Sequence, residues 1–183
     1  KKKIMTIEVE IRSFISKEKF EELIEFFKKE GNLIEIETDE TEYYADQGGV
    51  RLWKNNDYAK IILKSGNIHD DCREEYEIKF DKINFNHLQK MFEKLNIPKQ
   101  IKWFRKKYTF EWQNITIQVG HSLGYGYILE LEKLCKEEEK EKTLNLLKEK
   151  ILNLNIEITP KEIFEEKYNY YKNNWKELTK NGF

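Results

Sequence analysis

Charged residues alternate with apolar residues along several short segments of the chain, and the first of these segments is Glu8-Val9-Glu10-Ile11-Arg12. In a β-strand, successive side chains point to opposite faces, so Glu8, Glu10 and Arg12 share one face. The same alternation returns in two later segments, at Glu75 and Glu77 and at Glu130 and Glu132. Burial of several carboxylates on one covered face costs free energy unless cations or metal ions neutralise their charge. The pattern therefore predicts a charged cavity that binds a strongly ionic ligand.

The composition is that of a soluble domain with a modest core, because 39% of the 183 residues are hydrophobic and 37% are charged. A chain of this length fits one domain, which we place at 1–183 with its core at about 4–178. The formal net charge of −1 favours neither nucleic acid nor a membrane surface as a partner. No apolar run reaches transmembrane length, and Cys72 and Cys135 are isolated. We therefore expect a cytoplasmic protein with free thiols.

Eight segments with strand-like patterns are interrupted by four amphipathic helical segments. The strands are expected at 4–14, 33–44, 49–53, 58–64, 73–80, 101–112, 115–119 and 127–132. The helices are expected at 17–30, at 84–96, after the charge run 137–142, and from the capping box Thr159-Pro160-Lys161-Glu162. We predict an α+β fold in which a closed antiparallel β-barrel turns its polar faces inward and the helices pack outside. The alternative is an ordinary sandwich whose polar faces point to bulk water.

The predicted inner faces carry cations as well as carboxylates. The cations are Arg12, Arg51, Lys60, Lys64, Arg73, Arg105 and, at the margin of the set, Lys107. Cations that converge from several strands can hold a row of phosphates through charge-assisted hydrogen bonds. Clustered carboxylates can bind Mg²⁺ or Mn²⁺, which prefer oxygen ligands and often bridge to substrate phosphates. A phosphate-rich ligand with a divalent metal ion satisfies both sets of charges.

Six segments, in order, resemble the motifs of the CYTH superfamily, the triphosphate tunnel metalloenzymes. They are Glu8–Arg12 for the ExExK motif, Tyr43-Tyr44 with Val50–Trp53 for the tyrosine and the LRIR strand, Ile61–Gly66 for the strand ending in Lys-Gly, Arg73–Glu77 for the REExE segment, Arg105–Tyr108 for the KxRxxY strand and Gly126–Glu132 for the LGxFxExE strand. The resemblance extends over nearly the whole chain. By its element lengths, the chain is most similar to the compact class IV adenylate cyclases.

The resemblance implies a role for each residue of the tunnel. The implied catalytic residues are Glu10, Arg12 and Glu130, and the implied ligands of Mg²⁺ or Mn²⁺ are Glu8, Glu10, Glu130 and Glu132. The implied phosphate-binding residues are Arg51, Lys60, Lys64, Arg73 and Arg105, with Glu75 and Glu77 as further lumen carboxylates. To the substrate-binding set we add Trp53 and Trp103, whose indoles can stack on a base. The implied activity is metal-dependent processing of a nucleotide or polyphosphate. It is either cyclisation of ATP to cyclic AMP and pyrophosphate or hydrolysis of a triphosphate.

Four positions depart from the family pattern. Arg12 replaces a lysine, and arginine keeps the positive charge but cannot act as a base. Trp53 and Trp103 stand where basic residues are expected, and Gly120 stands where the family carries a metal-binding Asp. The two indoles can stack on a base or can fill the lumen as packing residues. The alternative function is therefore a repurposed tunnel that binds or cleaves a different nucleotide signal. A further option is a protein that acts through a partner or as a homodimer, with the aromatic last helix as its interface.

Overall fold

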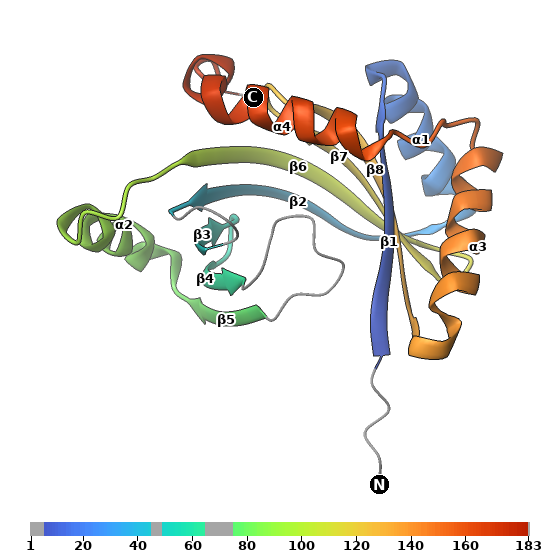
Figure 1. Ribbon diagram of the computed structural model, residues 1–183, viewed down its shortest axis with the longest axis horizontal. Helices are drawn as coiled ribbons and strands as arrows, with labels where there is room; N and C mark the ends of the chain where they lie inside the picture. The colour runs from blue at the N-terminus through green and yellow to red at the C-terminus, as the bar shows by residue number, and fades with distance from the viewer. Residues whose placement is uncertain (1–5, 45–48, 65–74, 183) are drawn as a thin grey trace, which may run out of the picture. The chain divides into compact units, whose positions relative to one another are not determined.

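The computed structural model describes residues 6–44, 49–64 and 75–182 (Figure 1). The strands are β1 (Thr6–Ile15), β2 (Asn32–Tyr43), β3 (Val50–Lys54), β4 (Ala59–Lys64), β5 (Glu75–Phe80), β6 (Ile101–Trp112), β7 (Ile115–Ser122) and β8 (Gly126–Lys136). The helices are α1 (Lys17–Glu30), α2 (Phe85–Lys94), α3 (Lys140–Asn153) and α4 (Lys161–Leu178), with the short 3₁₀ helices η1 (Lys82–Asn84) and η2 (Glu137–Glu139). The fold is α+β, as the sequence predicts. Within the described ranges, no helix is both long enough and apolar enough to cross a membrane.

The strands pair in the hydrogen-bonded order β1-β8-β7-β6-β2-β3-β4-β5. The pairs β1–β8, β7–β8, β2–β3, β3–β4 and β4–β5 are antiparallel. The order begins at β1 and ends at β5, so hydrogen bonds among the described residues do not close the sheet. The sheet is the predicted antiparallel one, while its closure into a barrel stays a prediction.

The chain divides into two compact units. The first unit comprises Lys1–Ile36 and Lys106–Tyr168, and the second comprises Glu37–Arg105 and Asn169–Phe183. Strands β2 and β6 and helix α4 each contribute residues to both units, because the boundaries fall within them. The predicted site residues divide in the same way, so the two groups are described one at a time.

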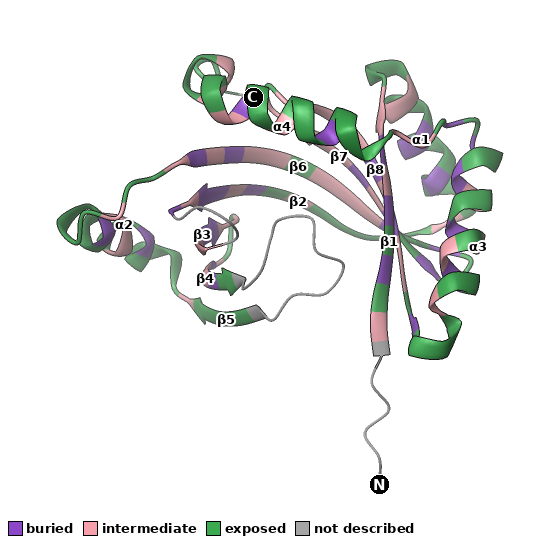
Figure 2. Ribbon diagram, viewed as in Figure 1, coloured by how far each residue is buried: buried purple, intermediate pink, exposed green. Residues whose placement is uncertain are grey.

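In the first unit, helices α1 and α3 cover the apolar face of β1, β7 and β8 (Figure 2). Val9 and Ile11 of β1 point to this face, opposite the one that carries Glu8 and Glu10. The buried cluster includes Val9, Ile11, Leu23, Ile24, Phe27, Phe110, Ile115, Ile117, Val119, Leu129, Leu131, Leu147 and Ile151. Burial of these side chains is the main stabilising term of the unit. It fixes which face of each strand is left for the charged residues.

Helix α1 is defined at both ends by its sequence. The Ser16 hydroxyl accepts a hydrogen bond from the Lys19 backbone N–H (3.1 Å), which satisfies one of the amides left open at the helix start. At the other end, a Cβ on Gly31 would lie 3.0 Å from the backbone oxygens of both Glu111 and Phe27. A Cβ this close to two backbone oxygens would force the backbone to shift, so the contact between the helix end and β6 favours glycine.

In the second unit, α2 covers one end of the β3–β4 hairpin. Phe85 and Phe92 of α2 are buried against Tyr44, Leu52 and Ala59. Met91 of α2 and Leu95, which follows the helix, continue the apolar periodicity of this segment, but their side chains are 55% and 64% exposed. The helix therefore buries a narrower face than its periodicity suggests.

We predicted that all the helices cover the apolar strand faces, but helix α4 contacts residues on the polar faces. In the first unit, its Phe164 stacks on Phe14, with ring centroids 4.5 Å apart. Phe14 follows Glu8, Glu10 and Arg12 on the polar face of β1. In the second unit, Tyr171 stacks on Trp103 of β6 at 4.1 Å, and its hydroxyl donates to the Lys102 carbonyl at 2.7 Å. Aromatic side chains thus attach α4 to faces that otherwise carry charge.

Thr159, the first residue of the predicted capping box, forms hydrogen bonds with Ser13 and Phe14 of β1. Its hydroxyl lies 2.8 Å from Ser13 Oγ and accepts a hydrogen bond from the Phe14 backbone N–H at 2.9 Å. Its own N–H donates to Ser13 Oγ at 2.8 Å. Ser13 is fully buried, so these bonds are shielded from water. They join the segment that precedes α4 to β1.

Candidate functional site

Three carboxylates of the first unit meet on the polar face of β1 and β8. Glu10 lies directly opposite Glu132 in the register of the two strands, and Glu8 is two residues before Glu10 on the same face. One carboxylate oxygen from each of Glu8, Glu10 and Glu132 lies within 4.8 Å of the other two. Three of the four predicted metal ligands are therefore together. The fourth, Glu130, is opposite Arg12 and is not one of this group.

Glu132 has the most strongly perturbed acidity in the cluster. Burial, followed by the negative charges of Glu130, Glu8 and Glu10, raises the pKa of its carboxyl to about 8, against an opposing effect of Lys107. A carboxyl with this pKa holds a proton at neutral pH unless a cation takes the place of the proton. The cluster is thus a site that favours a positive charge.

Gln118 is a site residue that the sequence analysis did not single out. Its Nε2 donates to both carboxylate oxygens of Glu132, at 3.2 and 3.3 Å. It lies opposite Glu130 in the β7–β8 register, which places it on the polar face. The alternation of Gln118 with the buried Ile117 and Val119 was a signal in the sequence that could have identified it.

The position at Gly120 has room for a side chain. A Cβ added there would lie 3.5 Å from Lys107 Cγ and 3.8 Å from the Lys106 carbonyl oxygen, which are ordinary contact distances. Gly120 is two residues from Gln118 and shares its face of β7. The Asp that the resemblance led us to expect at this position would therefore have space beside Lys107.

The three carboxylates fit a hard divalent cation. Mg²⁺ and Mn²⁺ take oxygen ligands. Glu8, Glu10 and Glu132 each offer one carboxylate oxygen, and these oxygens lie within 4.8 Å of one another. Gln118 supplies the outer hydrogen bonds that orient a ligating carboxylate. Among the described residues, the group has carboxylate oxygens as its ligands and no nitrogen or sulfur, which favours Mg²⁺ or Mn²⁺ over zinc.

Arg12 is held between two neighbours in the first unit. Its guanidinium carbon lies 4.7 Å from the centroid of the Phe164 ring, a cation–π contact with α4. In the β1–β8 register it is opposite Glu130. The side chain thus remains on the polar face with the carboxylates, as predicted, and α4 limits its freedom there.

In the second unit, the predicted phosphate-binding residues of β3 and β4 share one face with Glu77 of β5. Lys60 Nζ lies 3.0 Å from Glu77 Oε2. Burial lowers the pKa of Lys60, but the hydrogen bond and charge of Glu77 outweigh it, so the pKa is raised. Arg51 lies over the Tyr43 ring at 4.3 Å, and its Nε is buried with no hydrogen-bond acceptor among the described residues. Arg73 and the side chains of Lys64 and Glu75 lie outside the described part of the chain.

Arg105 makes a buried ion pair. Its Nε and one terminal nitrogen donate to Asp39 Oδ1 at 3.0 and 2.9 Å, and the Asp39 side chain is fully buried. Thr41 also contacts both partners, because it donates to Asp39 Oδ1 at 3.3 Å and accepts from Arg105 at 3.3 Å. The charge of Arg105 is therefore matched by a carboxylate that the sequence analysis did not consider.

Trp53 and Trp103, the two tryptophans that depart from the CYTH pattern, are buried against other side chains of the second unit. Trp103 is 8% exposed and stacks on Tyr171, with the two rings within 11° of parallel. Trp53 is 7% exposed and lies 5.2 Å from the Tyr58 ring. This burial is the arrangement expected of packing residues. Stacking of either indole on a ligand stays a prediction.

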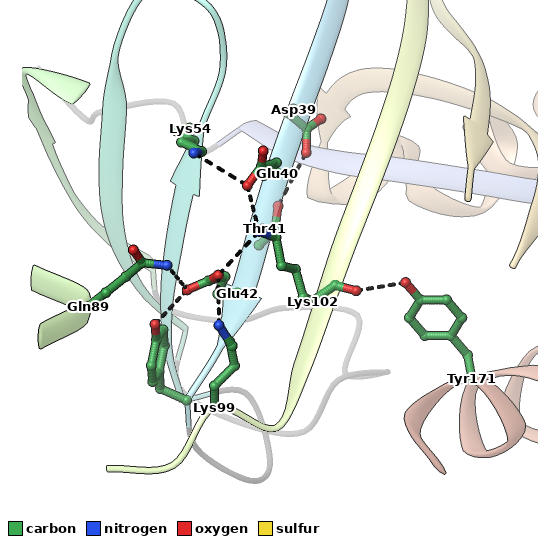
Figure 3. A network of polar contacts seen from close by, with 10 residues as sticks. Asp39, Glu40, Thr41, Glu42, Lys54, Gln89, Lys99, Lys102 and Tyr171 are labelled. Atoms are coloured by element: carbon green, nitrogen blue, oxygen red, sulfur yellow. Dashed lines mark hydrogen bonds and ion pairs between the residues drawn. The ribbon is translucent and has the colours of Figure 1, made fainter. Parts of the chain in front are cut away.

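The second unit also contains a buried polar network that the sequence did not reveal (Figure 3). Glu42 is fully buried, and its carboxylate accepts hydrogen bonds from Tyr44 at 2.5 Å, Gln89 at 2.8 Å and Lys99 at 3.1 Å. Burial raises the pKa of Glu42, but these bonds and the charge of Lys99 more than compensate, so the pKa is lowered. Lys102 adds an ion pair at 3.5 Å. The network joins β2 to α2 and β6.

Comparison with known proteins identifies the fold. No protein-family model and no curated protein matches the chain. Among solved structures, the PH1012 protein of Pyrococcus horikoshii OT3 matches with a TM-score of 0.63 at 20% identity, over 82% of this chain and 92% of that one. A Vibrio parahaemolyticus protein provisionally named an adenylate cyclase matches with a TM-score of 0.61 at 13% identity, over 87% and 98% of the two chains.

A second protein with the same provisional name, from Bacillus halodurans, matches with a TM-score of 0.57 at 17% identity, over 84% of this chain and 92% of that one. At such low identities, these similarities concern the fold alone. The chain shares the fold of these proteins along most of its length, in agreement with the resemblance to the CYTH superfamily.

Proposed function

We propose that the chain is a CYTH-type tunnel protein that processes a triphosphate or other nucleotide substrate with Mg²⁺ or Mn²⁺. The cluster of Glu8, Glu10 and Glu132 carries the proposal, because three carboxylate oxygens gathered on one face, two from exposed residues and one from a half-buried residue, attract a cation. The fold shared with two provisionally named adenylate cyclases supports this class of ligand. In this proposal the sheet closes into a tunnel, and the polar strand faces line its lumen.

Each group of residues has a defined task in the proposed site. When bound, the metal ion would neutralise negative charge on the phosphates. Glu8, Glu10 and Glu132 would hold it, after the loss of the proton that Glu132 carries at neutral pH. Arg51 and the other cations of β3 and β4 would position the phosphates for in-line attack.

Two reactions fit this arrangement. In cyclisation, the 3′ hydroxyl of ATP attacks the α-phosphorus, loses its proton and displaces pyrophosphate. In hydrolysis, water attacks the terminal phosphorus, and the shortened polyphosphate leaves. The similarity of the element lengths to class IV adenylate cyclases favours cyclisation.

The test is a panel of ATP, thiamine triphosphate and tripolyphosphate with Mg²⁺ or Mn²⁺, with products identified by chromatography. We expect turnover of one of them, abolished by Glu132→Gln and retained by Glu149→Gln, which changes an exposed carboxylate on α3. Absence of turnover for every substrate and metal would overturn the enzymatic proposal.

A second candidate function is binding without catalysis. Two of the predicted phosphate-binding cations are already paired, Lys60 with Glu77 and Arg105 with Asp39. This pairing reduces the positive charge available to a triphosphate and favours a ligand with fewer phosphates. Calorimetry separates the two functions: nucleotide binding that persists in chelator without turnover supports the binder, and binding that needs the metal supports the enzyme.

A further inference from the structure

Lys107 lies beside the carboxylate cluster, on the polar face of the first unit. Phe110 of β6 is buried in the apolar cluster, and Lys107 is three residues before it, so the lysine side chain points to the opposite face. A Cβ added at Gly120 would lie 3.5 Å from Lys107 Cγ, so the stem of Lys107 passes beside β7 at that position. Gly120 shares its face with Gln118, whose amide donates to Glu132. Lys107 is therefore a neighbour of the cluster from the adjacent strand.

The charge of Lys107 acts on the cluster. Burial and the neighbouring carboxylates raise the pKa of the Glu132 carboxyl, and the Lys107 ammonium lowers it. A charge on another strand has this effect only at short range, because water and salt screen distant charges. The next side chain of β6, Lys106, lies on the other face, with its Nζ 5.5 Å from the centroid of the Tyr108 ring. The ammonium of Lys107 thus acts at the place where Mg²⁺ or Mn²⁺ would bind.

A lysine at this position is unfavourable for a site that holds a metal ion alone. The ammonium would repel a divalent cation held by the three carboxylates, so Lys107 lowers the affinity of the cluster for the metal. The carboxylates in turn repel a phosphate that arrives without a metal ion. A metal ion and a phosphate together avoid both penalties, because the phosphate oxygens can contact the metal on one side and the ammonium on the other. The charges on this face therefore suit a metal–phosphate pair better than either part of it.

We propose that Lys107 binds the phosphate group that the metal ion of the cluster holds, and that it makes the binding of metal and phosphate cooperative. The coupling acts on both ligands, since each raises the affinity for the other by the same factor. The inference rests on the proposed function, because it needs a metal ion at the carboxylates. It assigns to one side chain of β6 the preference for metal and phosphate as a pair.

Lys107→Gln separates the two effects by their sign. It removes the ammonium, so Mn²⁺ alone should bind about threefold to tenfold more tightly. Tripolyphosphate should bind to the Mn²⁺-saturated variant at least about tenfold more weakly than to the wild type, because a charge-assisted contact is lost. Titration calorimetry at neutral pH measures both affinities, first with Mn²⁺ alone and then with tripolyphosphate in excess Mn²⁺.

Two variants are matched controls. Lys106→Gln makes the same change on the opposite face of β6 and should leave both affinities unchanged. Lys107→Arg keeps the positive charge and should retain the affinity for tripolyphosphate within about threefold of the wild type. Circular dichroism checks the fold of each variant.

The outcomes separate the role of Lys107 from the proposed function. If the wild type binds both ligands and Lys107→Gln keeps the wild-type affinity for tripolyphosphate, the role of Lys107 is overturned and the proposed function stands. A folded Lys107→Gln variant that loses affinity for Mn²⁺ as well would show that Lys107 supports the shape of the cluster, which also overturns the role. A wild-type chain that binds neither Mn²⁺ nor tripolyphosphate would overturn both.

Discussion

Glu10 and Glu132 face each other across two hydrogen-bonded strands, at a position where sheets ordinarily favour opposite charges. The proximity of Glu8 adds a third carboxylate, and burial adds to the repulsion. A proton on Glu132 relieves this repulsion, and so does a bound cation. The stability of the first unit and its affinity for metal should therefore both depend on pH.

The stability of the metal-free protein should fall as the pH rises from about 5 to 8. Glu132 has a pKa of about 8 in the folded protein, against an ordinary value of 4.5, so in this window the folded chain holds a proton that the unfolded chain releases. We expect a loss of roughly 3–4 kcal/mol in the free energy of unfolding across the window, levelling off above about pH 9.

Urea denaturation in the presence of chelator measures this effect. Glu132→Gln should flatten the pH dependence and stabilise the protein at pH 8. Glu149→Gln is the matched control and should retain the wild-type slope. An unchanged slope in Glu132→Gln would show that another group titrates.

Gln118→Leu should weaken Mn²⁺ binding by about tenfold at pH 7, because it removes the hydrogen bonds that orient Glu132 and favour its ionised form. Part of the loss should be recovered at pH 9, where a larger share of Glu132 is ionised in both proteins than at pH 7. Titration calorimetry at the two pH values measures the change. Equal affinities for the variant and the wild type at pH 7 would mean that Gln118 has no role in the site.

Gly120→Asp should tighten Mn²⁺ binding by less than about tenfold, because it adds a negative charge on the polar face where a side chain fits, four residues along β7 from the residue that faces Glu132. Gly120 does not require a left-handed backbone, so the substitution should not strain the strand. Gly120→Asn has the same shape without the charge and serves as the control. If Asp and Asn bind Mn²⁺ equally, the added charge does not reach the metal.

Arg105→Ala should destabilise the protein by about 3–5 kcal/mol, because it leaves the buried carboxylate of Asp39 without its partner. The double variant Asp39→Leu with Arg105→Leu should recover most of this loss, since it removes both charges. A double-mutant cycle by urea denaturation measures the coupling. If Arg105→Ala instead lowers ligand affinity with unchanged stability, Arg105 acts as a phosphate clamp.

The alternation of charged and apolar residues was sufficient to predict which strand faces are polar. It places Glu8, Glu10 and Arg12 together, and the β1–β8 register adds Glu132 to them. The pairing of Arg105 with Asp39 was not predictable in this way, because 66 residues separate the two and no local pattern encodes the contact. The direction of α4 was not predictable either, because an aromatic stripe shows that a helix packs but not on which face of the sheet.

The buried carboxylate of Glu42 has a consequence for how the second unit forms. Its partners Gln89 and Lys99 are 47 and 57 residues away along the chain, so each bond requires the closure of a long loop. Until those loops close, burial of the Glu42 charge costs free energy, because the neutral hydroxyl of Tyr44 would be the one partner among these that lies nearby in the sequence. The strand that carries Glu42 is therefore expected to become protected late in folding and together with α2 and β6. Contacts of such long range place this part of the chain among the slower-folding topologies.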